Sequence, residues 1–251
     1  MDERTIAAAI VIAFVLASAY FLSASRNVRV SPPQEAWAEK ARFQEDPQDA
    51  ALRQHMVDEL QGGNITDQRL LEAVGGIPRH LFLPEELRQQ AYTGFPLPIG
   101  FNRTTPQPYY VAYVVQAVHP GPKERVLEAG TGSGYQTAVL ASLSAEVYSV
   151  EKEGKLAEDA SKTLKTLGIE NAHVREGDPL KGWPDNAPYD VIIVNNAVSE
   201  IPDHLSGQLA PEGRMIFPLR ESDAYQRLTL VSRTAGTVET QPLIIVRYDP
   251  F

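Results

Sequence analysis

The chain has 251 residues, of which 43% are hydrophobic and 22% charged, as expected for a globular protein with one sizeable core. Its formal net charge of −9 argues against a nucleic-acid partner, because binding to phosphates needs clustered lysines and arginines, and the sequence has no such cluster. Without cysteine, the protein has no disulfide, thiolate metal ligand or cysteine nucleophile. The five histidines lack metal-ligand spacing, so we expect no metal site.

The first apolar segment, residues 5–25, contains no charged side chain. A helix over residues 6–22, with a rise of ~1.5 Å per residue, just spans a hydrocarbon core of ~30 Å. A cleaved signal peptide is one alternative, because residues 23–25 (Ser-Ala-Ser) resemble a cleavage site, but the preceding residues are not clearly basic. A buried core helix is the other, but no polar face recurs along the segment. We therefore expect residues 1–26 to form a single transmembrane anchor.

Basic residues beside this segment predict its orientation. Arg26 and Arg29 follow it, whereas only Arg4 precedes it. Because cytoplasmic flanks carry the excess of lysine and arginine, the large domain is expected on the cytoplasmic side.

Residues 27–50 have the character of a linker. Pro32 and Pro33 break any helix that continues from the membrane. A short helix over residues 34–44 would place Trp37 on one side. We expect this linker to be ordered against other subunits of a membrane complex, with Trp37 as a buried anchor.

The most informative motif is the glycine-rich turn at residues 130–134, which follows a short apolar run ending in Glu128-Ala129. Its alternate glycines allow a tight turn and let backbone N–H groups approach a ligand closely. Such a turn favours a nucleotide-type cofactor, but phosphate and dinucleotide sites use similar turns, and some glycine turns only pack a helix on a sheet.

Strands and helices are expected to alternate after this point. The predicted strands are residues 125–129, 146–150, 172–176 and 189–194, and the predicted helices are residues 136–144 and 155–167. Alternation predicts a parallel sheet with helices on both faces and a ligand at the carboxyl ends of the strands. Later strands are expected at residues 213–218, 227–233 and 238–246, with the last two including an antiparallel edge.

Several further motifs are collinear with one family. They are IPRHLFLPEEL (77–87), PLPIG (96–100), GWP (182–184), APYD (187–190), EIP (200–202) and VRYDPF (246–251). With the glycine turn, they make residues 56–251 resemble the protein-L-isoaspartate O-methyltransferases, and we assign a domain to residues 51–251. The resemblance implies a Rossmann-like α/β fold with a seven-stranded, mostly parallel sheet, and S-adenosylmethionine (SAM) as cofactor.

The resemblance also implies a cofactor site. In the glycine turn, the methionine portion of SAM would be wrapped by Gly130, Thr131, Gly132, Ser133 and Gly134. Glu151 would accept hydrogen bonds from the ribose hydroxyls, and Asp178 would face the adenine amino group. The alternative for both carboxylates is a solvated position at the end of a strand.

The acceptor loop departs from the family pattern. The family's histidine, glutamine and serine are replaced by Phe101, Arg103 and Pro106. Pro106 has no hydroxyl to contact a substrate carboxylate and no N–H, and Phe101 could fill the acceptor pocket. The remaining candidates for the catalytic hydroxyl are Thr104 and Thr105.

The cofactor side has changed as well. Pro179 stands where the family usually has glycine, which removes an N–H near the adenine, and Asn195-Asn196 stands where the family has Thr-Ala. These departures favour a membrane-anchored, catalytically degenerate relative, a pseudoenzyme serving as an accessory subunit of a membrane complex, in which SAM binding is weakened or lost. One alternative is an active, membrane-tethered protein-L-isoaspartate O-methyltransferase. Another is a SAM-dependent methyltransferase with a new acceptor.

Overall fold

The computed structural model describes residues 46–222, 225–234 and 237–246. The predicted anchor at residues 1–26 and most of the linker, including Trp37, lie outside these residues, so both stay predictions. Within the described ranges, no helix combines the length and the apolar character needed to cross a membrane.

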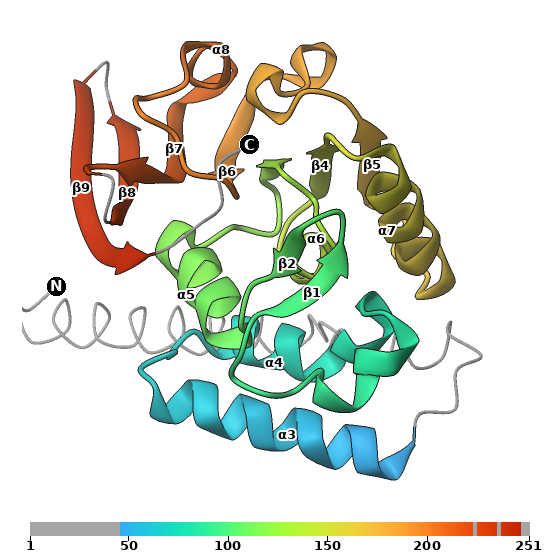
Figure 1. Ribbon diagram of the computed structural model, residues 1–251. Helices are drawn as coiled ribbons and strands as arrows, with labels where there is room; N and C mark the ends of the chain where they lie inside the picture. Colours follow the sequence, from blue (N-terminus) through green and yellow to red (C-terminus); the bar gives the residue numbers. More distant parts are fainter. Residues whose placement is uncertain (1–45, 223–224, 235–236, 247–251) are drawn as a thin grey trace, which may run out of the picture. The chain divides into compact units, whose positions relative to one another are not determined.

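Two helices open the described part of the chain (Figure 1). Helix α3 (Pro47–Gly62) is capped by Asp46, whose side chain accepts a hydrogen bond from the Gln48 N–H. The first residue of the helix is proline, which suits a position where no N–H is needed. Helix α4 (Gln68–Gly76) is capped in the same way by Asp67. Because α3 begins inside the predicted linker 27–50, the domain boundary at residue 51 stays a prediction.

Short elements connect these helices to the cavity described below. They are the 3₁₀ helices η1 (Arg79–Phe82) and η2 (Glu85–Gln90), the hairpin strands β1 (Leu97–Gly100) and β2 (Arg103–Thr105), and helix α5 (Pro108–Val118). The hairpin turns through Phe101 and Asn102, which both have the positive φ of the left-handed region. The hairpin forms a separate two-stranded sheet.

The main sheet has seven strands in the order β5-β4-β3-β6-β7-β8-β9. Its strands are β3 (Arg125–Ala129), β4 (Glu146–Glu151), β5 (Ala172–Glu176), β6 (Tyr189–Val194), β7 (Leu209–Arg220), β8 (Gln226–Thr234) and β9 (Thr237–Val246). The pairs from β5 to β7 are parallel, while β7–β8 and β8–β9 are antiparallel. The predicted mostly parallel sheet with an antiparallel edge is therefore confirmed.

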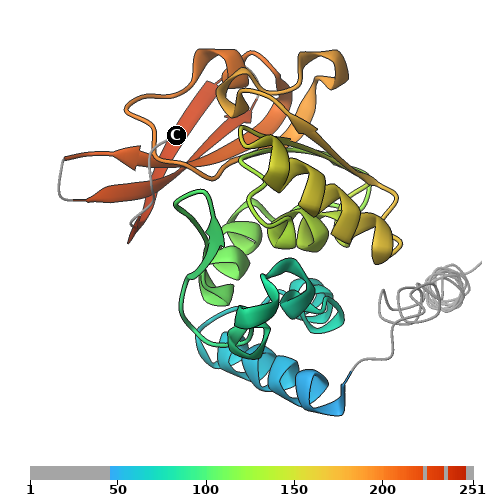
Figure 2. The ribbon, with the colours of Figure 1, turned by 45° about the vertical axis from the view of Figure 1, so that its right-hand side comes forward.

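The two faces of this sheet are covered differently (Figures 1 and 2). Alternate strand residues such as Val126 and Val191 belong to the core that includes α3 to α6 and α7 (Gly154–Thr166), whereas Leu127 and Ile192 point to the other side. That second core is closed by the four-residue helix α8 (Asp203–Ser206) and by loops containing η3 (Pro179–Lys181) and η4 (Pro184–Asn186). The expectation of helices on both faces thus holds for one face fully and for the other only through these short elements.

Most strand bounds agree with those expected from the apolar runs in the sequence. Strands β3, β5 and β6 begin and end at the residues expected from their apolar runs. Strand β7 is longer than the expected 213–218, because its start at Leu209 pairs with Tyr189 across a bulge and includes exposed residues that hydropathy does not mark. Helix α6 (Tyr135–Ala141) starts directly at the end of the glycine turn.

Candidate functional site

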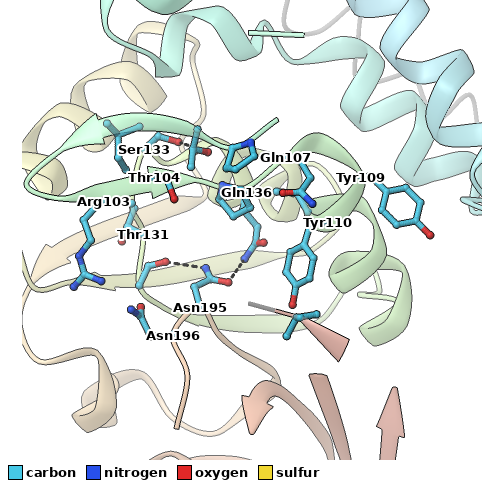
Figure 3. Close-up of a pocket in the computed structure, with 18 of the residues that line it drawn as sticks. Arg103, Thr104, Gln107, Tyr109, Tyr110, Thr131, Ser133, Gln136, Asn195 and Asn196 are labelled. Atoms are coloured by element: carbon cyan, nitrogen blue, oxygen red, sulfur yellow. Dashed lines mark hydrogen bonds between the residues drawn. The ribbon is translucent and has the colours of Figure 1, made fainter. Parts of the chain in front are cut away.

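A cavity of about 820 Å³ lies at the carboxyl ends of β3, β4 and β6, under the β1–β2 hairpin (Figure 3). This volume is within the range of small-molecule sites, ~300–1,000 Å³. The described residues that line it are Pro96, Ile99, Arg103, Thr104, Thr105, Pro106, Gln107, Tyr109, Tyr110, Val111, Gly130, Thr131, Gly132, Ser133, Gln136, Glu151, Asn195, Asn196, Tyr225, Ile244, Ile245 and Val246. Among them, Arg103 is the one lysine or arginine and Glu151 the one carboxylate.

The glycine turn forms one wall of the cavity. Gly130, Gly132 and Gly134 have φ of 102°, 55° and 87°, a region that L side chains rarely adopt. A Cβ on Gly134 would lie 2.9 Å from the Ala160 Cβ in α7, so this glycine also lets α7 pack closely. The Gly130 N–H donates to the Val150 carbonyl at 2.8 Å, which ties the turn to β4.

Glu151 closes the same wall at the end of β4. Its side chain is 5% exposed and lines the cavity. One carboxylate oxygen accepts a hydrogen bond from the Gly132 N–H at 2.8 Å, and the other accepts one from the Glu153 N–H at 3.1 Å. A carboxylate has about four acceptor positions, so Glu151 can accept two more hydrogen bonds from a ligand.

A buried polar network lies behind the turn. The Glu128 carboxylate, with no exposed surface, accepts hydrogen bonds from Gln136, Thr137, Ser149 and Asn195. Burial raises the pKa of Glu128 to about 7, against the opposing effect of these donors. Asn195 also donates to the Gly130 carbonyl at 2.8 Å and accepts from Gln136, a bond drawn in Figure 3.

The network leaves one atom without a partner. Among the described residues, Oε1 of Gln136 is buried and accepts no hydrogen bond, while its Nε2 is used twice. Gln136 lines the cavity, so a ligand with a donor group such as an ammonium could satisfy this oxygen. No group of acidic or histidine side chains in the described part of the chain could hold a metal ion.

The acceptor loop forms the opposite wall. Thr104 is exposed and lines the cavity, whereas Thr105 is 3% exposed and its Oγ1 accepts a hydrogen bond from the Ser133 hydroxyl at 3.4 Å. The two predicted hydroxyls therefore differ, since one is available from the cavity and the other faces the cofactor turn. In Figure 3 both walls are visible, with Thr104 above Thr131.

Two predicted effects of the sequence departures, at Phe101 and Pro179, look different in the structure. Phe101 is 54% exposed at the hairpin turn and is not among the residues that line the cavity, so the expectation that it fills the acceptor pocket is wrong. Pro179 is the first residue of η3, where an N–H is not needed, and Asp178 caps that helix through the Leu180 N–H. Asp178 is exposed and does not line the cavity, and its predicted contact with adenine stays a prediction.

Sequence reasoning missed part of the lining. Tyr225 and residues 244–246 reach the cavity because the antiparallel strands β8 and β9 return beside the parallel strands, which no local motif indicates. Gln107 also lines the cavity, and its side chain makes no hydrogen bond within the described residues. Its position in the acceptor loop, two residues after Thr105, could have identified it as a candidate lining residue from the sequence.

Comparisons with known proteins agree on one family. The family model of protein-L-isoaspartate(D-aspartate) O-methyltransferases matches residues 51–251. A relative from Opitutus terrae named protein-L-isoaspartate O-methyltransferase is 46% identical over 200 residues, which cover 79% of this chain and 86% of the relative. A solved structure with the same name is 29% identical with a TM-score of 0.72, covering 79% of this chain and 65% of that one. A Plasmodium falciparum structure described as a putative member in complex with S-adenosyl-L-homocysteine shares the fold, with 22% identity and a TM-score of 0.69 over 79% of this chain and 97% of that one.

These findings overturn the expectation of a catalytically degenerate accessory subunit. A relative with 46% identity over most of both chains is named as the enzyme, and nothing in the comparisons supports a subunit without activity. The physical reason is that the substitutions do not close the site, because the cavity is open beside Pro106 and Phe101 points out of it. The chain belongs to the protein-L-isoaspartate(D-aspartate) O-methyltransferase family of SAM-dependent methyltransferases.

Proposed function

We propose that this protein is an active protein-L-isoaspartate O-methyltransferase, which transfers a methyl group from SAM to the carboxylate of isoaspartyl residues in proteins. The observation that carries the proposal is the cavity between the glycine turn and the acceptor loop, in a chain 46% identical to a relative of that name. The expectation of an inactive protein rested on substitutions in the acceptor loop, and these substitutions leave the cavity open.

The residues on the cofactor side fit SAM. Glu151 is buried at the cavity edge with acceptor positions to spare, which suits the two hydroxyls of a ribose. Oε1 of Gln136 has no donor within the described part of the chain, which suits an ammonium group. The N–H groups and small residues from Gly130 to Gly134 allow close approach of the methionine portion.

When bound, SAM supplies an electrophilic methyl group on a positively charged sulfur. In the proposed reaction a carboxylate oxygen of the substrate forms the new bond to the methyl carbon as the carbon–sulfur bond breaks, and the bonding pair stays on sulfur. No proton moves, and a cation and an anion become a neutral thioether and a neutral ester. The protein's task is therefore to align the two reactants and exclude water, rather than to act as an acid or base.

On the acceptor side, we propose that Thr104 is the hydroxyl that orients the substrate carboxylate. Its side chain is exposed to the cavity and has no hydrogen bond within the described residues, whereas the Thr105 hydroxyl is engaged by Ser133. Gln107 offers a second free donor from the start of α5.

The test is a methyl-transfer assay with labelled SAM and two synthetic peptides that differ only in having isoaspartate or ordinary aspartate at one position. We expect transfer to the isoaspartyl peptide, and methanol release from the product at alkaline pH, which identifies a methyl ester. Absence of transfer to the isoaspartyl peptide, with the protein shown to be folded, would refute the proposal. Equal transfer to both peptides would refute the substrate class and favour a methyltransferase with another acceptor.

We also propose that residues 5–25 tether the enzyme to a membrane, with the domain on the cytoplasmic side. The support is the uncharged segment and the arginines that follow it. Protease added outside sealed right-side-out vesicles should leave the domain intact, and digestion there would overturn the orientation. Association with other membrane subunits through Trp37 stays a prediction from the sequence.

A further inference from the structure

Arg79, in η1, is a buried cation that has no acidic partner among the residues the structure describes. Its side chain has no exposed surface, and it makes no ion pair within the described residues. Burial lowers the pKa of Arg79, and its Nε has no hydrogen-bond partner there. A buried charge of this kind costs free energy, and an apolar side chain of similar volume would fill the same space without that cost. The position therefore calls for an explanation other than stability.

The guanidinium joins elements on both sides of the cavity. Nη2 donates to the Pro106 carbonyl at 2.8 Å and Nη1 donates to the Ala91 carbonyl. Its central carbon lies 5.4 Å from the centre of the Tyr135 ring, a cation–π distance. Pro106 belongs to the acceptor loop, and Tyr135 is the first residue of α6, directly after the glycine turn.

The bond to Pro106 fixes the part of the loop that faces the substrate. The carbonyl of Pro106 and the N–H of Gln107 share one planar peptide group, so holding the oxygen also fixes the plane from which the backbone of Gln107, a residue that lines the cavity, continues. On the other side of Pro106, β2 ends at Thr105, which pairs with Leu97 in the hairpin. The Arg79 bond thus ties this peptide group to η1, in addition to the bonds by which the Tyr110 and Val111 N–H groups of α5 hold the Gln107 carbonyl.

The glycine turn does not depend on Arg79 in the same way. Its backbone is held by the bonds from Gly130 to Val150, from Gly132 to Glu151 and from Gly134 to Thr131. Loss of the guanidinium would therefore remove one anchor of the acceptor loop, while the glycine turn keeps the three bonds named above.

We propose that Arg79 is a positioning residue that sets the acceptor loop against the cofactor wall, an inference that rests on the proposed function. It acts through Pro106 and Tyr135 and does not itself line the cavity. Displacement of a reacting group by about 1 Å can cost about 100-fold in rate, so the loss of this link is expected to act on turnover of the peptide.

The test uses the full chain with Arg79→Met, which keeps much of the volume, and Arg79→Lys, which keeps the charge but not the two-pronged geometry. For Arg79→Met we expect kcat/KM for the isoaspartyl peptide to fall about 10- to 100-fold, while the S-adenosylhomocysteine Kd by calorimetry changes less than about threefold. Arg79→Lys should recover part of the loss, because an ammonium reaches one carbonyl.

Arg233→Met is the matched control, since Arg233 also donates to two backbone carbonyls, those of Leu209 and Ser206, and does not line the cavity. It should leave kcat/KM and Kd unchanged even where it lowers the melting temperature. If Arg79→Met does not fold, Arg79→Lys decides the question, and wild-type kinetics in that variant would overturn the proposal. Parallel losses of peptide turnover and S-adenosylhomocysteine affinity would also overturn it. An inactive wild-type protein would instead refute the proposed function.

Discussion

The two sides of the cavity are held by different kinds of contact. On the cofactor side, the glycine turn and Glu151 are extensions of the neighbouring strands β3 and β4, and their hydrogen bonds continue those of the parallel sheet. On the acceptor side, the β1–β2 hairpin is a separate two-stranded sheet, and the loop after it is linked to η1 by Arg79, 27 residues away in the sequence.

This difference bears on how the substitutions in the acceptor loop are interpreted. A turn that is part of the sheet ladder tolerates little variation, because its N–H groups and its positive φ values are fixed by the strands on either side. The acceptor loop is held by its backbone carbonyl rather than by the identity of residue 106, so proline can stand there while the loop keeps its place. Substitutions in this loop are therefore weak evidence for loss of activity.

The largest effect is expected on the cofactor side. Glu151→Ala should weaken S-adenosylhomocysteine binding at least about 100-fold, because hydrogen bonds from two hydroxyls to a charged acceptor are worth about 1.5–3 kcal/mol each. The substitution also leaves the Gly132 and Glu153 N–H groups without their acceptor. Calorimetry measures the effect, with Glu158→Gln as the control, an exposed carboxylate paired only with Lys155 within the described residues. A loss smaller than about tenfold would mean that Glu151 does not hold the cofactor.

The next prediction concerns Glu128 and pH. Because burial raises its folded-state pKa to about 7, from about 4.5, the folded state binds the proton more tightly than the unfolded chain does. The contribution of Glu128 to stability is therefore highest below about pH 4.5 and decreases as the pH rises to about 7. Relative to Glu128→Gln, which does not titrate, wild-type stability should fall by about 3 kcal/mol over that range.

Urea unfolding of the two proteins at several pH values measures this difference. Other carboxylates titrate in both proteins, so they cancel in the comparison. A difference in stability that is constant with pH, or one that rises with pH, would show that burial does not raise the pKa of Glu128 in the fold.

The same contrast decides what the sequence could predict. Strands β3 and β6 and the glycine turn come from contiguous residues, an apolar run followed by alternate glycines, so their positions were predicted correctly. The direction of Phe101 was not, because the hairpin turn places it in the left-handed region and out of the cavity. A substitution pattern shows which residue changed, whereas the direction of its side chain depends on backbone geometry.

Contacts between distant segments could not be predicted from the sequence either. Tyr225 and strand β9 line the cavity only because the antiparallel edge folds back along the sheet. Arg79 was recognised as part of a family motif, but its bond to Pro106 joins residues in separate elements. Neither hydropathy nor local spacing carries such information.

A smaller effect is expected on the acceptor side, where the two threonines form a matched pair. Thr104→Val keeps the shape of the side chain and removes a hydroxyl proposed to donate to the substrate carboxylate, so kcat/KM for the isoaspartyl peptide should fall about 10-fold. Thr105→Val removes a hydroxyl that meets Ser133, and its effect should stay within about threefold. Steady-state kinetics of both variants measures the two losses of kcat/KM. A larger loss in Thr105→Val than in Thr104→Val would contradict the prediction and assign the substrate contact to Thr105.

The most direct test of the account compares the wild-type protein with Pro106→Ser in the same methyl-transfer assay. The backbone carbonyl that Arg79 holds is present in both, so the loop keeps its link. We predict that the wild-type protein methylates the isoaspartyl peptide and that Pro106→Ser changes kcat/KM by less than about threefold. A wild-type protein that transfers no methyl group, together with a Pro106→Ser variant that does, would contradict the claim that this chain is active with proline in its acceptor loop.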